Sequence, residues 1–343
     1  MNGLRAGALG VVGGLCALLL WAAPVHAQTI ELKLSDWVPP SHPLNTTGFV
    51  QWADAIAKSS GGTLKVRIFP AQQLGQAKDH YDMARDGIVD FGYINPGYTA
   101  GRFPIIAAGE LPFLMSNAKD GSAALDEWYR PYAKTEMADV HYCLAFVHDP
   151  STIHARKMIT KPEEIRGMKV RPADATIANL VASLGGSSVQ VSAPEAREAL
   201  ERGVADAITF PWNSLILFGI DKSVTYHMDA PFYVTTFVIV MNKARYDGLG
   251  AAQKKAIDEN CNAPAAKKVA EGWADWEAAG RELLLKNPAH HIYPISAADL
   301  SAWRKAAEPL RQTWANDVRK AGQDPDKVMR ELEATLKKYN SAS

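Results

Sequence analysis

The sequence is poor in cysteine and carries no net charge. Only three of its 343 residues are cysteine, and Cys16 lies in an N-terminal apolar run. Cys143 and Cys261 are too few to form a disulfide scaffold, and we expect both to be free thiols. The 37 basic and 37 acidic residues balance, and no basic block is present. Nucleic acid and anionic membrane surfaces are therefore poor partners for this chain.

Long apolar runs are missing beyond the N-terminus. The most apolar later segment, TTFVIVMN, is far shorter than the roughly 18 residues that span a bilayer. The N-terminus itself has a basic start, MNGLR, an apolar core and small residues in PVHA before Gln28. Leu15 precedes Cys16, where a lipoprotein signal needs a small residue. We therefore expect residues 1–27 to be a cleaved signal peptide and the mature chain to be exported.

Motifs of the common enzyme classes are also missing. The sequence contains no GxSxG turn, HExxH helix, Walker phosphate loop, CxxC pair or dinucleotide-binding glycine fingerprint. His148 and His154 could in principle share a metal, but no third ligand stands near them. Asp90 and Asp206 stand at predicted strand starts, where stabilising a turn suits them better than acid–base catalysis. We predict no enzymatic activity, no cofactor and no metal.

What the sequence does contain is an alternation of strand and helix patterns. Apolar residues alternate over 30–35 and again over 64–68, whereas the stretch 44–59 has helical spacing. This order predicts an α/β protein with mixed sheets that helices cover on both faces. The mature chain exceeds the length that one core usually serves, so we expect two lobes.

Two segments of the chain resemble each other. MARDGIVDFGYINP at 83–96 and ALERGVADAITFPW at 199–212 each contain a helix end, a glycine, an apolar pair, an aspartate, a strand and a proline turn. We interpret them as one supersecondary unit used once in each lobe. The carboxyl ends of both strands would then point into a shared cleft.

Two apolar strand patterns, HYCLAFVH and FYVTTFVIVMN, flank the middle of the chain. We interpret them as crossovers and the middle segment as a lobe inserted into the other. The predicted limits are 28–148 plus about 236–276 for lobe I, and 149–235 plus about 277–343 for lobe II. A long helix at about 263–287 would span both lobes as a spine.

The strongest candidate for a binding residue is Arg171. It ends the short alternating strand GMKVR and is followed at once by a helical pattern. Ligands of open α/β sheets bind beyond the carboxyl ends of the strands, and a guanidinium matches a carboxylate with paired donors. The alternative is a solvated arginine. Several aromatic and polar residues also fall at predicted strand ends, as a pocket requires, although each aromatic alone could serve packing.

These patterns belong to a known type of sequence. SDWVPPSHPL, LKVRIFPAQQLG, GYTAGRFP with LPFL, EEIRGMKVRPAD and APEAREALERGVADAITFPWN resemble the solute-binding proteins of tripartite ATP-independent periplasmic (TRAP) transporters, the C4-dicarboxylate-binding-protein-like family. The resemblance covers essentially the whole mature chain. It implies a two-lobed periplasmic-binding-protein fold that closes on its ligand by hinge motion and delivers it to membrane permease subunits. It also implies that Arg171, in the GxKxR motif, clamps a carboxylate.

The chain departs from the sialic-acid and C4-dicarboxylate members of the family. Ser151 takes the place of a second arginine, and Phe210 replaces an asparagine in the second-lobe turn. We therefore expect a monocarboxylate with an aromatic, branched or keto-acid body. A C4-dicarboxylate or a sugar acid is the alternative. The predicted site comprises Arg171, Trp37, Asn95, Tyr98, Phe146, His148, Ser151, Phe210, Trp212 and Asn213.

Three other possibilities stay open at this point. A secreted enzyme on a two-lobed scaffold would need a nucleophile and a base within hydrogen-bond reach. A sensory receptor would present the same closed surface to a different membrane partner. We expect a monomer, although the long helix near Trp273 and Trp276 could also support a swapped dimer.

Overall fold

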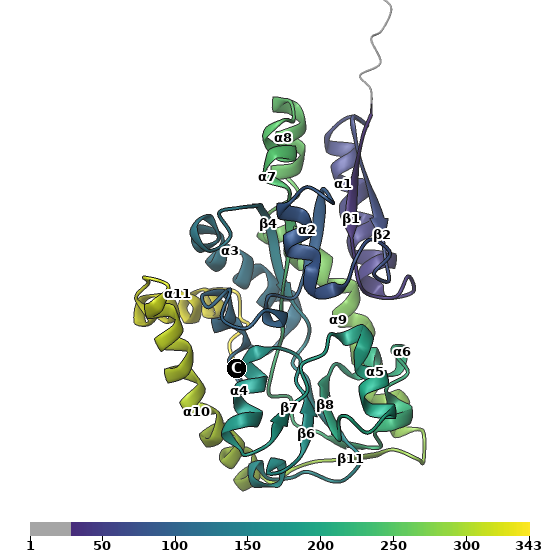
Figure 1. Cartoon of the computed structure of the whole chain (residues 1–343), viewed down its shortest axis with the longest axis vertical. Helices are drawn as coiled ribbons and strands as arrows, with labels where there is room; N and C mark the ends of the chain where they lie inside the picture. Colours follow the sequence, from purple (N-terminus) through teal and green to yellow (C-terminus); the bar gives the residue numbers. More distant parts are fainter. Residues whose placement is uncertain (1–28) are drawn as a thin grey trace, which may run out of the picture.

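The computed structural model describes residues 29–343. The predicted signal peptide, residues 1–27, lies outside the described residues. The described part has two mixed sheets flanked by helices, one in each of two lobes that are stacked along the long axis of the molecule (Figure 1). Among residues 29–343, no helix has the length and apolar character needed to cross a membrane.

The first sheet has the order β2-β1-β3-β10-β4. Its strands are β1 (Ile30–Ser35), β2 (Leu64–Phe69), β3 (Phe91–Ile94), β4 (His141–Val147) and β10 (Thr236–Met241). The first three are parallel, and β10 is antiparallel to both of its neighbours. Its helices are α1 (Phe49–Ser59), α2 (His80–Arg85), α3 (Ala118–Glu136), α7 (Lys243–Asp247) and α8 (Ala251–Asp258). A π-helical turn, Leu44–Gly48, leads into α1, so the predicted helix has two parts.

The second sheet has the order β11-β9-β5-β8-β6-β7. Its strands are β5 (Thr152–Ala155), β6 (Lys169–Arg171), β7 (Ser187–Ser188), β8 (Ala207–Phe210), β9 (Tyr226–Met228) and β11 (His291–Tyr293). The helices of this half are α4 (Ala175–Ser183), α5 (Ala193–Glu201) and α6 (Trp212–Leu217), and the chain ends in α10 (Ala297–Lys320) and α11 (Pro325–Lys338). The prediction of mixed sheets flanked by helices is confirmed.

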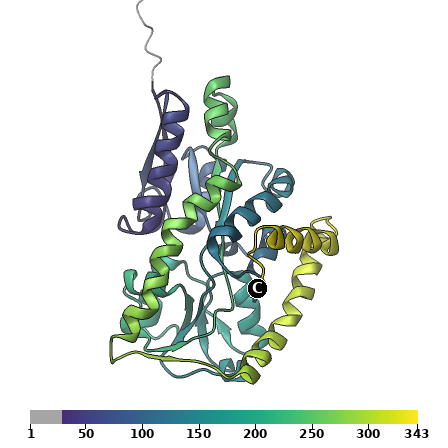
Figure 2. The ribbon, with the colours of Figure 1, turned by 180° about the vertical axis from the view of Figure 1, so that it is seen from behind.

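The two sheets are connected in three places. The chain leaves the first sheet after β4 and returns to it at β10, and these two strands pair with each other. Between them, Ser151 and Tyr233 form a single antiparallel bridge. The long helix α9 (Ala263–Leu285) packs against β4 of the first sheet and β11 of the second, and Figure 2 shows it running along both lobes. The residue limits of the lobes stay a prediction.

The two similar sequence segments occupy equivalent places. Asp90 precedes β3 and Asp206 precedes β8, and each strand is parallel to its partner, β1 or β6. The Asp90 carboxylate accepts the backbone N–H of Lys33 at 2.7 Å, and that of Asp206 accepts the backbone N–H of Lys169 at 2.9 Å. The two aspartates thus hold the starts of equivalent strands in register, which confirms their predicted structural role.

The prediction of free thiols is wrong. Cys143 on β4 and Cys261, between α8 and α9, form a disulfide with a Cα–Cα distance of 4.5 Å, which lies in the range that a disulfide requires. The two residues are 118 positions apart. They meet because β4, the edge strand of the first sheet, packs against α9, which begins just after Cys261, a proximity that cysteine number and spacing do not reveal.

Candidate functional site

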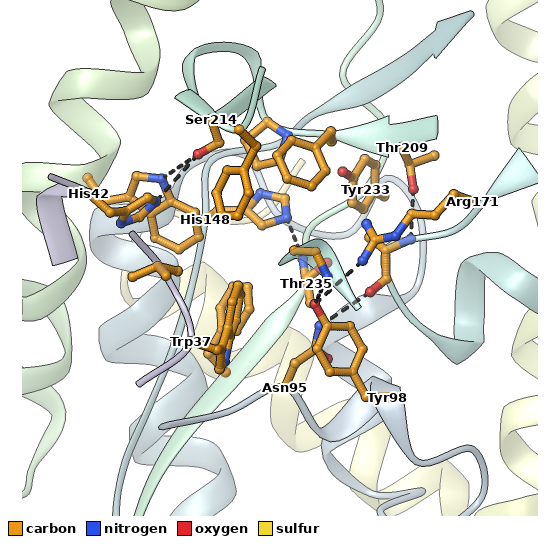
Figure 3. A pocket seen from close by; sticks show the side chains of 18 residues that line it. Trp37, His42, Asn95, Tyr98, His148, Arg171, Thr209, Ser214, Tyr233 and Thr235 are labelled. Carbon is orange, nitrogen blue, oxygen red and sulfur yellow. Dashed lines mark hydrogen bonds between the residues drawn. The ribbon is translucent and has the colours of Figure 1, made fainter. Parts of the chain in front are cut away.

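A pocket that encloses about 390 Å³ of space, open solvent included, lies at the carboxyl ends of β3, β6 and β8, and α9 contributes to its wall (Figure 3). Such a position between two sheets is where α/β receptors hold small ligands. The cavity is lined by Trp37, Val38, His42, Asn95, Tyr98, His148, Arg171, Ala173, Ala193, Thr209, Phe210, Pro211, Ser214, Phe218, Tyr233, Thr235, Phe237 and Trp273.

Arg171 is a buried cation without an acidic partner. Only 1% of its surface is exposed. Its Nε donates to the carbonyl of Val191 at 3.0 Å, and its Nη2 lies 3.5 Å from the hydroxyl of Tyr98. None of the ion pairs among residues 29–343 includes Arg171. A buried charge is costly unless it is paired, so this guanidinium is suited to bind an anion from outside the chain.

The acid closest in sequence, Asp174, does not provide that anion. One of its carboxylate oxygens accepts the backbone N–H of Ile177 at 2.9 Å and so caps α4. The other accepts the hydroxyl of Thr235 at 3.1 Å. Both oxygens are thus engaged by other donors and no ion pair joins Asp174 to Arg171, although the positive charge of Arg171 lowers the pKa of Asp174 against the larger effect of burial.

Further donors surround the guanidinium. The Tyr98 oxygen accepts the backbone N–H of Ala193 at 2.9 Å, and its own proton has no acceptor among the described residues. Asn95 uses its oxygen for the backbone N–H of Gly97 and donates to the carbonyl of Ala173 at 3.3 Å. Tyr98 follows β3 of the first sheet whereas Arg171 ends β6 of the second, so donors from both lobes converge at one end of the cavity.

Aromatic rings form much of the remaining wall. Trp37 stacks on the buried ring of Tyr93 at a centroid distance of 4.9 Å, and its ring centroid lies 6.2 Å from that of Phe237. Phe237 in turn contacts Trp273 of α9 at 5.5 Å. The guanidinium carbon of Arg171 lies 5.7 Å from the Phe210 ring centroid. The cavity therefore combines one cation with an aromatic interior.

Both histidines of the lining are neutral. Burial lowers the pKa of His42 to about 3 and that of His148 to about 4. His148 is also satisfied on both nitrogens, because Nε2 accepts the backbone N–H of Thr235 at 3.1 Å and Nδ1 donates to the carbonyl of Asp149 at 2.6 Å. Near neutral pH, Arg171 is therefore the sole charged side chain among the described lining residues.

The structure brings six of the ten predicted site residues to the cavity. These are Arg171, Trp37, Asn95, Tyr98, His148 and Phe210. They were predicted to meet because they fall at the ends of neighbouring strands, and in the observed sheets these strand ends do lie around one cavity.

The other four predicted residues lie outside the lining. Phe146 forms a second layer behind it, stacked on Tyr93 at 5.7 Å. Ser151 is in the bridge that connects the segments between the sheets. The ring of Trp212 packs against His154 at 5.0 Å, and Asn213 donates to the carbonyl of Trp276 at 2.7 Å, which holds α6 on α9.

Several lining residues were missed by the sequence reasoning. His42 follows the first strand within SDWVPPSHPL, a segment from which only Trp37 was predicted to reach the site. Ser214 lies on α6, and Trp273 lies on the long helix, where strand-end reasoning does not look. Tyr233 and Thr235 belong to the connecting segment just before β10. The only sequence signal for them was their place within the predicted crossover FYVTTFVIVMN.

The protein has relatives of known family and structure. The family described as "Bacterial extracellular solute-binding protein, family 7" matches residues 34–317. An outer membrane transporter protein, TsaT of Comamonas testosteroni, is 25% identical over 315 residues, which are 89% of this chain and 92% of that protein.

Solved structures resemble the whole described chain. A TRAP solute-binding protein from Rhodoferax ferrireducens with copurified benzoate is 30% identical, with a TM-score of 0.85, over 91% of this chain and 99% of that one. The same values hold for a marine metagenome TRAP protein specific for aromatic acids, in complex with 3-hydroxybenzoate. A Bordetella bronchiseptica TRAP protein with bound mandelate is 25% identical, with a TM-score of 0.84, over 90% and 99% of the two chains. The chain thus belongs to family 7 of the bacterial extracellular solute-binding proteins and is a TRAP solute-binding protein.

Proposed function

We propose that the protein is a periplasmic receptor that captures an aromatic monocarboxylate and delivers it to the membrane permease subunits of a TRAP transporter. The observation that carries the proposal is Arg171, a buried cation with no acidic partner among residues 29–343, in a cavity walled by aromatic rings. In this proposal the N-terminal segment, residues 1–27, directs export and is removed.

The charge of the cavity favours one carboxylate over two. Arg171 is positive, and His42 and His148 are neutral near pH 7. A second carboxylate of a C4-dicarboxylate would enter the cavity without a cation and would lose its hydration. A sugar acid would place several hydroxyl groups against Trp37 and Phe237. A single carboxylate on an aromatic body meets neither cost.

The ligands of related proteins point the same way. The Rhodoferax protein holds benzoate, the marine protein holds 3-hydroxybenzoate and the Bordetella protein holds mandelate. Each of these ligands carries one carboxylate on or near an aromatic ring, which is the chemistry that the cavity of this chain complements.

In the proposed complex, Arg171 pairs with the ligand carboxylate and Tyr98 donates its free proton to it. The ligand ring lies among Trp37, Phe210 and Phe237. Because Tyr98 follows the first sheet and Arg171 belongs to the second, a bound carboxylate bridges the two lobes and favours the closed arrangement. The segments around Ser151 and Tyr233 connect the sheets and would absorb the hinge motion.

Two further points support binding without turnover by a monomer. His42 Nδ1 accepts a backbone N–H from Leu44, so the proton of the neutral ring is on Nε2. That nitrogen therefore cannot take a proton from Ser214, its neighbour on the lining. Trp273 faces the cavity, and Trp276 packs on His42 at 5.8 Å, so both tryptophans of the long helix are used within the chain and are not needed for a swapped dimer.

A thermal unfolding screen tests the proposal. The mature protein is refolded to remove carried-over ligand and mixed with benzoate, mandelate, succinate, galacturonate or an amino acid. A true ligand at about 100 times its Kd stabilises the fold by roughly 2.7 kcal/mol. We expect benzoate or mandelate to stabilise the protein and to be recovered unchanged. In Arg171→Gln this stabilisation should be lost.

The matched control is Arg202→Gln, because Arg202 is exposed, follows α5 directly and forms its one ion pair among the described residues with Glu198 of that helix. It should respond to ligand as the wild type does. Stabilisation by succinate with silence toward every aromatic acid would contradict the proposal.

A further inference from the structure

The end of the cavity opposite Arg171 is polar and is not used by a carboxylate bound at Arg171. Figure 3 shows His42 and Ser214 facing each other there. His42 Nε2 lies 3.5 Å from Ser214 Oγ, at the outer limit of a hydrogen bond. The two residues are 1% and 2% exposed, so neither polar group has bulk water as an easy alternative partner.

The proton of His42 is fixed on the nitrogen that faces this end. The backbone N–H of Leu44 lies 3.2 Å from His42 Nδ1. A backbone N–H only donates, so Nδ1 presents a lone pair, and a neutral imidazole then carries its proton on Nε2. Since the contact of Nε2 with Ser214 is long, this N–H is a donor with capacity for a better acceptor.

Ser214, in contrast to His42, presents a hydrogen-bond acceptor at this end of the cavity. Its hydroxyl donates to Glu277 Oε1, and its own backbone N–H and that of Asn213 also donate to this carboxylate, the latter at 2.6 Å. The indole N–H of Trp273 lies 2.8 Å from Glu277 Oε1 and 3.3 Å from Ser214 Oγ. When Glu277 is ionised, its carboxylate accepts the hydroxyl proton and holds the rotamer, which leaves a serine lone pair for His42. Burial raises the pKa of Glu277 to about 7, so this orientation is most populated above that pH.

The second histidine of the lining shows that this arrangement is specific. His148 uses Nε2 to accept from the backbone of Thr235 and Nδ1 to donate to the carbonyl of Asp149. It offers the cavity only its ring. His42 and Ser214 instead place one underused donor beside one acceptor, and a hydroxyl group, which both donates and accepts, is the matching partner.

We infer that His42 and Ser214 form a subsite for a hydroxyl group on the ligand ring, remote from the carboxylate, and that the receptor selects hydroxylated aromatic acids over their unsubstituted parents. The inference rests on the proposed function, since it places the carboxylate at Arg171. The ring then spans the aromatic middle of the cavity and carries its hydroxyl to the far end. Glu277 acts as a positioning residue that orients Ser214.

Calorimetric titration with four acids tests the subsite. The probes are benzoate and its ortho-, meta- and para-hydroxy forms. We expect the meta or the para acid to bind about tenfold more tightly than benzoate, the gain of one good hydrogen-bonding group. The ortho acid places its hydroxyl beside the carboxylate, at the Arg171 end, and should gain nothing from the subsite.

The variants are Ser214→Ala and His42→Phe, with His291→Phe at an exposed position as the control. In both subsite variants the advantage of the hydroxylated acid should fall below about threefold, while the control keeps it. The readout is the ratio of two Kd values in one variant, so a fraction of inactive protein does not affect it.

The outcomes separate the two proposals. Benzoate that binds through Arg171 with no advantage for either remote hydroxyl overturns the subsite alone. An advantage that survives in both Ser214→Ala and His42→Phe also overturns it. If none of the four acids binds, the aromatic-acid function fails, and the subsite fails with it.

Discussion

Two buried charged regions lie on either side of the turn between β6 and α4, and they differ in how their charge is compensated. On the cavity side, Arg171 forms no ion pair with an acid among residues 29–343. On the other side, Glu110 and Asp174 are 1% and 3% exposed, and neither forms an ion pair with a cation among residues 29–343. One region is thus a cation that lacks an anion, and the other is a pair of acids that lack a cation.

The chemistry of the side chains explains why both regions are stable arrangements. Arginine does not lose its proton in a protein, so its charge can be balanced only from outside. A buried carboxylate can take up a proton. Burial raises the pKa of Asp174 to about 6, and burial together with the nearby Asp174 raises that of Glu110 well above its usual value. The first region therefore awaits a ligand, whereas in the second the raised pKa of Glu110 favours the uptake of a proton.

Glu110 also connects the two lobes. Its carboxylate accepts the hydroxyl of Thr236 on β10 at 2.8 Å and that of Thr176 on α4 at 3.0 Å. The first donor belongs to the first sheet and the second to a helix of the other lobe. Protonation of this acid thus lowers the cost of burying it between the two lobes.

The largest expected effect comes from removing the unpaired cation. In Arg171→Met we expect the affinity for benzoate to fall more than about 100-fold, because the carboxylate loses its buried charged partner. Without ligand, the unfolding midpoint should not fall, since an uncompensated buried charge is removed. Titration calorimetry and thermal unfolding of the same samples measure both. If the ligand-free variant instead lost as much free energy of unfolding as it lost free energy of binding, Arg171 would be a structural residue.

A smaller effect is expected for Glu110→Gln, and it is a gain in stability rather than a loss of ligand binding. Folding raises the pKa of Glu110 above its ordinary value of 4.5. Between that value and the raised pKa, the folded protein holds a proton that the unfolded chain releases, so stability declines as pH rises. Glutamine cannot ionise. As pH rises, the free energy of unfolding of the variant should therefore increase relative to that of the wild type, by at most about 1.4 kcal/mol per pH unit.

Urea unfolding at several pH values between about 5 and 8 measures this difference. Glu163→Gln is the control, because Glu163 is exposed and its replacement should leave the pH dependence unchanged. Equal slopes for the wild type and Glu110→Gln would mean that Glu110 is ionised in the folded protein.

The smallest effect is expected for Thr176→Val, which removes the hydroxyl that Glu110 accepts from α4. The loss should cost about 1 kcal/mol and weaken benzoate binding several-fold, because the bond favours the closed arrangement. The cost should increase with pH, since an ionised acceptor forms the stronger hydrogen bond. Titration at two pH values checks this. Thr335→Val, which loses a hydroxyl bonded within its own helix, should leave affinity unchanged.

Much of the fold was predictable because it depends on local patterns. The alternation in the first two strands, the strand that ends in Arg171, and the paired aspartates Asp90 and Asp206 each have a signal within a few residues. The carboxyl ends of strands converge by topology alone, which is why six of the predicted residues reach the cavity.

The remaining features arise from contacts distant in sequence. His42 and Trp273 meet only because α9 crosses the loop after β1, and Cys143 meets Cys261 across 118 residues. Glu110 had no pattern that separated it from a surface acid. Its burial depends on α4 and β10, which come from different lobes.

The disulfide makes the stability of the chain depend on the compartment in which it resides. It closes a loop of 118 residues that contains all of β5 to β9, and closing such a loop stabilises a fold by roughly 4 to 5 kcal/mol. Disulfides form in oxidising compartments and not in the cytosol. With the export that we propose, the newly made chain lacks this bond and unfolds easily for passage through the membrane. After export and oxidation, the disulfide stabilises the folded receptor against unfolding. The same sequence therefore has a lower free energy of unfolding before export than after it.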